Sequence, residues 1–173
     1  MESSSELDKY GRPYPPKCDG FLIPRTAADA IVIKKSTTDK DDFEVLMITR
    51  KKETFHGKLA FPGGHIDYGE DPIEACVREL QEECGIIGAK PELVAVRGKP
   101  ERDPRYHMIS IFYLVEVHEG QQVVAGDDAS TAKYYSIKEL LKQKDNFAFD
   151  HYEVLVDLIR KRTELELLKA FIP

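Results

Sequence analysis

Apolar and polar residues alternate along the chain in two rhythms, one typical of strands and one typical of amphipathic helices. Short apolar runs bounded by turn residues predict strands over residues 27–33, 44–50, 92–97, 107–117 and 132–136. Helical spacing predicts helices over residues 72–84, 137–142 and from about residue 150 onwards. Because apolar strands precede and follow the first helix, this order predicts an α/β fold. We expect an α/β/α sandwich, with a mixed β-sheet between the first and the last helix.

The helix predicted over residues 72–84 has clear start and stop signals. Asp71 can accept hydrogen bonds from the first N–H groups, and Pro72 needs no N–H at the first helical position. Gly85 can take the left-handed conformation that ends a helix. An apolar stripe at helical spacing is expected to face the core and consists of Ile73, Cys76, Val77, Leu80 and Cys84.

Three glutamates of this helix share one flank. Glu79, Glu82 and Glu83 are related as i, i+3 and i+4, and their flank borders the apolar stripe. Carboxylates held together near a core repel one another unless a positive charge lies among them, and Arg78 can reach Glu82 at i+4. The remaining negative charge suits a hard divalent cation such as Mg2+, which takes oxygen ligands. For such a cluster taken alone, the alternative is a solvated acidic face of a helix.

The stretch from residue 64 to residue 86 resembles the Nudix box, whose pattern is G-x5-E-x7-R-E-U-x-E-E-x-G-U, with U an aliphatic residue. Every fixed position matches, namely Gly64, Glu70, Arg78, Glu79, Leu80, Glu82, Glu83, Gly85 and Ile86. The resemblance implies a Nudix hydrolase, a metal-dependent enzyme that cleaves the pyrophosphate bond of a nucleoside diphosphate linked to another moiety. It also implies Mg2+ or Mn2+ as the cofactor. The implied ligands are the carbonyl oxygen of Gly64 and the carboxylates of Glu79, Glu82 and Glu83.

Stretches outside the box are similar to one branch of the family, the ADP-ribose pyrophosphatase-like branch. They span residues 103–110, 126–129 and 147–151. This branch implies ADP-ribose as the substrate, cleaved to AMP and ribose 5-phosphate. Two alternatives stay open: a sanitising enzyme that hydrolyses oxidised nucleoside triphosphates to the monophosphate and pyrophosphate, and a non-catalytic nucleotide-sensing module. A damaged box is the usual mark of the second alternative, and this box is intact.

The general base of the implied reaction is left open between two places in the chain. In some family members it is a box glutamate, which here is Glu79, and in ADP-ribose enzymes it can be a carboxylate from a loop after the box. Asp127 and Asp128 are the loop candidates, and Asp103 is a third. We favour Glu79, because the helix fixes it beside any bound metal ion. Arg78 and Glu70 are expected to hold the loop to the helix.

Basic residues near the box are candidates for binding the phosphates of the substrate, and they are Arg50, Lys52, Lys58 and Arg105. For the first three, the alternative is a solvated basic run. Aromatic side chains are candidates for stacking on a nucleobase, or else belong to the core, and they are Phe55, Tyr68, Tyr106 and Phe149.

Length and composition fit one domain, with 173 residues of which 42% are hydrophobic and 32% are charged. Residues 25–173 are expected to form the Nudix domain. Residues 1–24, which are rich in proline and glycine, are expected to form an N-terminal arm. The arm would pack on the domain or on the second subunit of a homodimer. The alternative for its first ten residues is a disordered tail.

Charge and sequence patterns exclude several classes of partner. A net charge of -6 argues against nucleic acid, and we expect only one helix after Asp150, which leaves no element for a DNA-binding domain. No apolar run has the length of a membrane span, and the first nine residues contain no signal-peptide core. Three cysteines without a C-x-x-C pair favour a reduced, cytoplasmic location. The expected partner is therefore a small-molecule nucleotide substrate.

Overall fold

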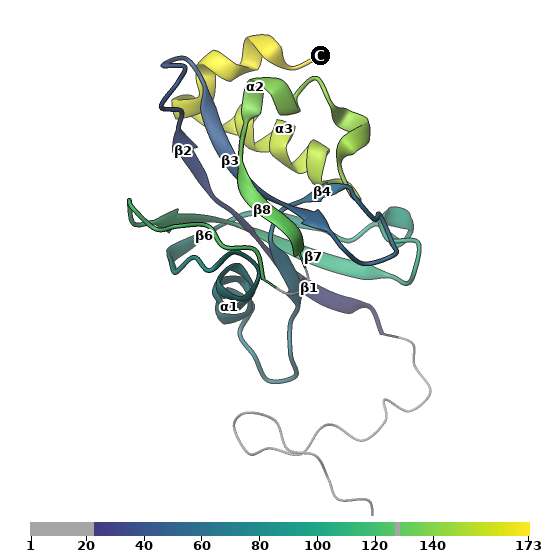
Figure 1. Ribbon diagram of the computed structural model, residues 1–173. Coiled ribbons are helices and arrows are strands. Elements are labelled where there is room, and N and C mark those ends of the chain that lie inside the picture. Colours follow the sequence, from purple (N-terminus) through teal and green to yellow (C-terminus); the bar gives the residue numbers. More distant parts are fainter. Residues whose placement is uncertain (1–22, 127–128) are drawn as a thin grey trace, which may run out of the picture.

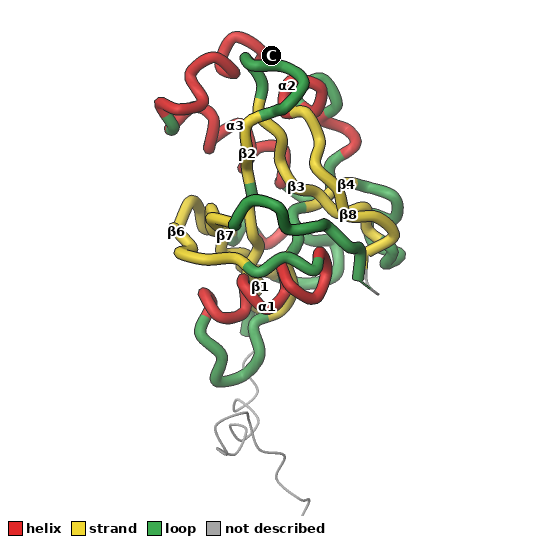
Figure 2. Tube along the Cα trace, turned by 60° about the vertical axis from the view of Figure 1, so that its left-hand side comes forward, coloured by secondary structure: helices red, strands yellow, loops and turns green. Residues whose placement is uncertain are grey.

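The computed structural model describes residues 23–126 and 129–173 (Figure 1). The predicted N-terminal arm therefore lies outside the described residues except for its last two positions, and so do Asp127 and Asp128. Strands form the middle layer of the molecule. One long helix lies below this layer and the C-terminal helices lie above it, in both views (Figure 1, Figure 2).

Two four-stranded sheets make up the middle layer. The first sheet has the order β5-β1-β7-β6 and consists of β1 (Arg25–Ile31), β5 (Gly63–His65), β6 (Gly88–Arg97) and β7 (Met108–Val117). It is mixed, because β1 and β7 run parallel whereas the other neighbours run antiparallel. In the second sheet every strand pairs with the central β3, and its strands are β2 (Ile33–Lys35), β3 (Phe43–Arg50), β4 (Leu59–Ala60) and β8 (Ala129–Ser136).

Helices cover both sides of the sheets. The α-helices are α1 (Pro72–Cys84), α2 (Ile137–Leu140) and α3 (His151–Lys161). The described residues also form the 3-10 helices η1 (Pro100–Arg102), η2 (Lys144–Asn146) and η3 (Thr163–Phe171).

The alternation of side chains along β3 explains the two cores. Val45 and Met47 point into the core shared with α2 and α3, whereas Leu46 and Ile48 point into the core shared with α1. Successive side chains of a strand point to opposite faces, so a strand that is apolar at every position serves two cores at once. The predicted α/β/α sandwich is therefore confirmed, with its strands divided between two sheets.

The helix α1 begins and ends as predicted. The side chain of Asp71 accepts a hydrogen bond from the N–H of Ile73 at 2.8 Å, and Gly85 adopts φ 67° and donates to the carbonyl of Gln81. The predicted apolar stripe is wrong at its N-terminal end. Ile73 is 44% exposed in the first turn, and the small Ala75 is buried instead.

Several elements differ from the prediction: β6 begins at Gly88 and not at residue 92, β8 begins at Ala129 and not at residue 132, and β4 and β5 were not predicted. Tertiary packing explains two further differences. The apolar run 27–33 is split at Val32, where the chain passes from β1 in one sheet to β2 in the other. A further helix, η3, follows α3, so the expectation of a single helix after Asp150 is wrong. Leu165 and Leu168 of η3 are buried against α3. The basic run before them gave no sign of this contact in the sequence.

Candidate active site

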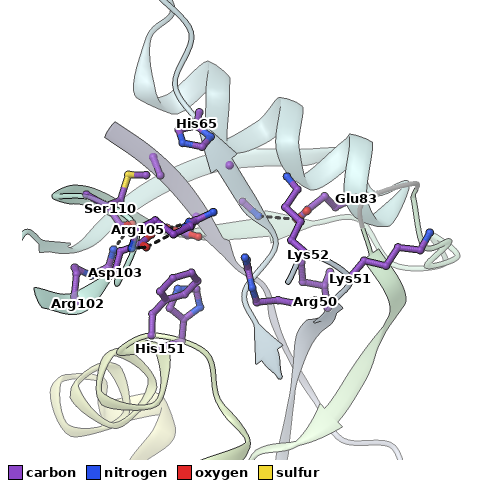
Figure 3. A pocket seen from close by; sticks show the side chains of 17 residues that line it. Arg50, Lys51, Lys52, His65, Glu83, Arg102, Asp103, Arg105, Ser110 and His151 are labelled. Atoms are coloured by element: carbon purple, nitrogen blue, oxygen red, sulfur yellow. Dashed lines mark hydrogen bonds and ion pairs between the residues drawn. The ribbon is translucent and has the colours of Figure 1, made fainter. Parts of the chain in front are cut away.

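A polar pocket opens between the two sheets beside α1 (Figure 3). The end of β3 contributes Arg50 and Lys52 on one side, and the loop around η1 contributes Arg105 on the other. Gly64 of β5 and Glu83 of α1 line the same pocket. The structure therefore brings five of the predicted site residues together. They are drawn from four separate elements.

Arg78 holds the box together. Its guanidinium pairs with Glu70 at 2.9 Å, with Glu79 at 2.7 Å and with Glu82 at 3.2 Å. It also donates to the carbonyl oxygen of His65 at 3.0 Å. Because these partners lie on both the loop and α1, Arg78 fixes the loop to the helix, and Glu70 takes part in the same contact.

Glu83 lies deeper than Glu79 and Glu82. It is 9% exposed, and its carboxylate accepts a hydrogen bond from the N–H of Gly63 at 2.9 Å. Burial raises the pKa of Glu83 to about 7, and burial also raises the pKa of Glu79. Glu79 packs directly on the backbone of Gly64, where a Cβ atom would lie 2.4 Å from its Oε1. Any other residue at position 64 would push the Glu79 carboxylate away from this position.

The donor set of these residues fits a hard divalent cation. The carboxylates of Glu79 and Glu83 are largely removed from water, and both flank the Gly63–Gly64 backbone. Burial disfavours the negative charge of these carboxylates, and a divalent ion would stabilise that charge. Within the part of the chain that the structure describes, no three such side chains are already arranged as a metal cluster. Arg78 pairs with one oxygen of Glu79 and one oxygen of Glu82, so a bound ion would share these two carboxylates with the guanidinium.

The basic candidates separate into two groups. Arg50, Lys52 and Arg105 line the pocket, whereas Lys58 lies outside the lining and donates to the carbonyl of Asp145 at 2.6 Å. The Nε of Arg50 donates to the carbonyl of Thr54, its one side-chain hydrogen bond to described residues. Its remaining N–H groups are thus available for a phosphate.

Asp103 is held by Arg105. The guanidinium donates to both carboxylate oxygens, at 3.0 and 2.7 Å. Burial opposes ionisation, but these bonds outweigh it, and the pKa of Asp103 lies below its usual value. A carboxylate that is paired in this way is a weak proton acceptor, which argues against Asp103 as the general base.

The aromatic candidates form two contacts. Phe55 and Phe149 pack with ring centroids 4.7 Å apart, and Arg50 lies 4.8 Å from the ring centre of Phe149. Tyr106 shares a hydrogen bond of 3.3 Å with His65 and is outside this group. Phe55 and Phe149 both have positive φ, at 58° and 51°, which is rare for bulky side chains and is found most often at functional sites.

Sequence reasoning missed a buried polar group at the floor of the pocket. Arg102 donates to both oxygens of Asp150, the shortest distance being 2.6 Å, and to the hydroxyl of Ser110 at 2.9 Å. Asp29 lies beside Ser110. Arg102, Ser110 and Asp150 belong to or adjoin the stretches 103–110 and 147–151. The resemblance of these stretches to the ADP-ribose branch could therefore have pointed to them.

His151 completes the floor. Its Nδ1 accepts a hydrogen bond from the N–H of Phe61 at 3.0 Å, which places the proton of the neutral ring on Nε2. Complete burial is the main cause that lowers the pKa of His151 to about 3.

This buried histidine predicts a pH-dependent stability difference. Between pH 6.5 and 3 the unfolded chain takes up a proton on His151 and the folded chain does not, so folding weakens as the pH falls. Relative to a His151→Gln variant, the wild type should lose about 1.4 kcal/mol per pH unit in this window. Urea unfolding of both proteins at pH 7, 6 and 5 measures the difference. A difference that is constant with pH would contradict it.

Comparison with known proteins identifies the family. A family model for the NUDIX domain matches residues 24–158. The ADP-ribose pyrophosphatase of Methanocaldococcus jannaschii is 39% identical over 140 residues, which cover 81% of this chain and 76% of that protein. The 8-oxo-dGTP diphosphatase of Escherichia coli is 44% identical over 79 residues, which cover 44% of this chain and 59% of that protein.

A solved structure extends the match to three dimensions. A bifunctional NMN adenylyltransferase/ADP ribose pyrophosphatase from Francisella tularensis, complexed with AMP and Mn ion, is 26% identical. The TM-score is 0.69, and the match covers 82% of this chain and 43% of that chain. The protein therefore belongs to the Nudix family, and the predicted family, fold and enzyme class are confirmed. As a Nudix hydrolase it works with a divalent metal ion. Within residues 23–126 and 129–173, no helix is long and apolar enough to cross a membrane.

Proposed function

We propose that the protein hydrolyses ADP-ribose to AMP and ribose 5-phosphate. The observation that carries this proposal is the pocket itself, which joins the box carboxylate of Glu83 to a cationic rim and a polar floor. The rim suits the two phosphates, and the floor suits an uncharged sugar or base. The 39% identity to an ADP-ribose pyrophosphatase over most of the chain supports the same substrate.

Mg2+ or Mn2+ is the proposed cofactor, held by the carbonyl oxygen of Gly64 and the carboxylates of Glu79, Glu82 and Glu83. When bound, the ion would polarise the phosphoryl oxygens and lower the pKa of a water molecule. The Mn ion in the related Francisella tularensis structure supports this assignment. Arg78 orients Glu79 and Glu82 from the other side.

Arg50, Lys52 and Arg105 are proposed to bind the pyrophosphate of the substrate. They line the pocket from two sides, and the face of Phe149 supports the guanidinium of Arg50. A planar guanidinium with free N–H groups can bind two phosphate oxygens at once. Glu79 is proposed as the general base.

Replacing Arg50 by methionine should raise KM for ADP-ribose about tenfold or more, because a charge-assisted hydrogen bond to phosphate is lost. The matched change Lys58→Met should leave KM within about twofold, since Lys58 contacts the Asp145 carbonyl outside the pocket. Initial rates against substrate concentration measure both. Equal effects of the two changes would contradict the placement of the rim.

A substrate panel tests the proposed function. ADP-ribose, NADH, a nucleoside diphosphate sugar and oxidised dGTP are each incubated with Mg2+ or Mn2+, and the products are separated by chromatography. AMP and ribose 5-phosphate from ADP-ribose as the best substrate support the proposal. Pyrophosphate from oxidised dGTP as the best substrate would overturn it and favour the second candidate, to which the 44% identity with an 8-oxo-dGTP diphosphatase points.

A further inference from the structure

Asp29 is a buried carboxylate that the metal-dependent chemistry above does not use. It lies on β1, between Gly63 of β5 and Phe112 of β7 in the register of the sheet. It is 6% exposed and lines the pocket. Its Oδ1 lies so close to Gly63 that a Cβ atom at position 63 would be 2.5 Å away. The strand pairing therefore fixes the position of this carboxylate at the floor.

One oxygen of Asp29 has no partner. Ser110 lies beside the carboxylate and lowers its pKa, but Oδ2 has no hydrogen-bond partner among the residues that the structure describes. Arg102 is the cation that lowers the pKa of Asp29 most, but its hydrogen bonds go to Asp150 and Ser110 and none goes to Asp29. Glu79 and Asp150 add negative charge nearby. The groups around Asp29 therefore neither neutralise its charge fully nor fill all of its hydrogen-bond acceptor positions.

A buried carboxylate oxygen without a hydrogen-bond partner destabilises the fold unless a ligand donates the missing hydrogen bond. Nearly all buried polar atoms in folded proteins have a hydrogen-bond partner, and a buried acceptor without one costs about 1–3 kcal/mol. Burial raises the pKa of Asp29 to about 7, which reflects the same cost. Bulk water does not supply the missing donor, because the side chain is almost closed off from solvent.

We propose that Asp29 determines specificity by accepting a hydrogen bond from an uncharged O–H or N–H group of the substrate. This inference rests on the proposed function, and it names the chemistry at the pocket floor. Phosphate oxygens carry no such donor and would be repelled by the carboxylate. They belong at the rim, beside Arg50 and Arg105. The floor then receives a donor from either a ribose hydroxyl or the amino group of the adenine.

A site built around a buried acceptor rejects analogues that lack the donor, because the acceptor is then left unpaired. Testing the two product halves separately shows whether the donor is a ribose hydroxyl or the amino group of the adenine. Binding of AMP and of ribose 5-phosphate is measured by calorimetry in EDTA, for the wild type and for Asp29→Asn. We expect one half to bind about tenfold more weakly or worse in the variant, and the other to change less than about twofold. The half that is affected identifies the moiety at the floor.

Substrate analogues give the reciprocal test. The hypoxanthine analogue of ADP-ribose lacks the amino group, and a deoxyribose analogue lacks one hydroxyl. The wild type should cleave the matching analogue with a kcat/KM reduced by about 10²-fold or more. In Asp29→Leu, whose side chain has no acceptor, the same analogue and ADP-ribose should differ by less than about threefold.

Stability separates this role from a structural one. Asp29→Asn removes a buried charge without a full partner, so its Tm at pH 7.5 should equal or exceed that of the wild type. Asp42→Asn is the matched control. Asp42 is 4% exposed, but Ser136 and the N–H groups of Phe43 and Lys138 donate to it, so its replacement should lower Tm and leave the affinity for both halves unchanged.

Ser110→Ala is a second variant in case Asp29→Asn folds poorly. It removes the hydroxyl beside Asp29 and keeps the carboxylate, so the same half should lose affinity to a smaller extent. Unchanged affinity for both halves in both variants would overturn the role of Asp29. A wild type that cleaves another nucleotide instead of ADP-ribose overturns the proposed function alone. The binding comparison is then made with the halves of that nucleotide.

Discussion

Glu83→Gln should lower kcat for ADP-ribose by about 10²-fold or more at saturating Mg2+, because it removes a charged ligand from the ion that carries transition-state charge. The glutamine keeps the shape, and its amide oxygen can still accept the hydrogen bond from Gly63. A defect in folding is therefore not expected. Glu82→Gln should cause a loss of the same order, although Glu82 is more exposed and pairs with Arg78.

Two measurements check this result. Steady-state rates over a range of Mg2+ concentrations give kcat, and electron paramagnetic resonance of free Mn2+ gives the affinity for the ion without turnover. Glu116→Gln is a matched control, since Glu116 is an exposed glutamate paired with Lys90 far from the pocket. A Glu83→Gln or Glu82→Gln variant with the wild-type rate in the same metal would refute the assignment of that ligand.

The box could be predicted residue by residue because its structure is local. The cap of Asp71, the left-handed Gly85 and the contact of Arg78 with Glu82 all follow from spacing along one helix. Strand positions followed in the same way from apolar runs. Exact ends did not, since the split at Val32 depends on which sheet each half joins.

The pocket floor could not be predicted, because its contacts join residues far apart in the chain. Arg102 meets Asp150 across 48 positions, and His151 meets Phe61 across 90. Asp29 is a single acidic residue within an apolar run, where spacing gives no reason to single it out. Lys58 was predicted in the site but lies outside it. It follows a basic run, but the turn at Gly57 directs its side chain to Asp145.

The identity of the general base is the second question with a large expected effect. Glu79→Gln should lower kcat by about 10²-fold or more, whereas Asp127→Asn and Asp128→Asn should each lower it less than about tenfold. Glu79 is partly buried against Gly64, and burial raises its pKa, which favours proton uptake. Its carboxylate also shares Arg78 with Glu82, so it lies beside the proposed metal ligands.

The rival hypothesis draws support from the same structure. The backbone before Asp127 is attached to the end of α1. The N–H of Val124 donates to the backbone carbonyl of Cys84 at 2.9 Å, and the N–H of Gly126 donates to the backbone carbonyl of Glu83 at 3.0 Å. A Cβ atom at Gly126 would lie 2.0 Å from the carbonyl oxygen of Glu82, so the approach requires glycine. Gly126 therefore lies against the C-terminal end of the box helix.

Glu79→Gln alone cannot separate the two hypotheses, because a metal ligand and a base are both lost with it. The deciding measurement is kcat against pH for Asp127→Asn and Asp128→Asn at saturating metal. If Glu79 is the base, both variants keep the acidic limb of the wild-type profile, since the group that must lose its proton is unchanged. If either variant loses about 10³-fold in kcat with KM little changed, and its acidic limb disappears, the loop carries the base and Glu79 serves only as a ligand.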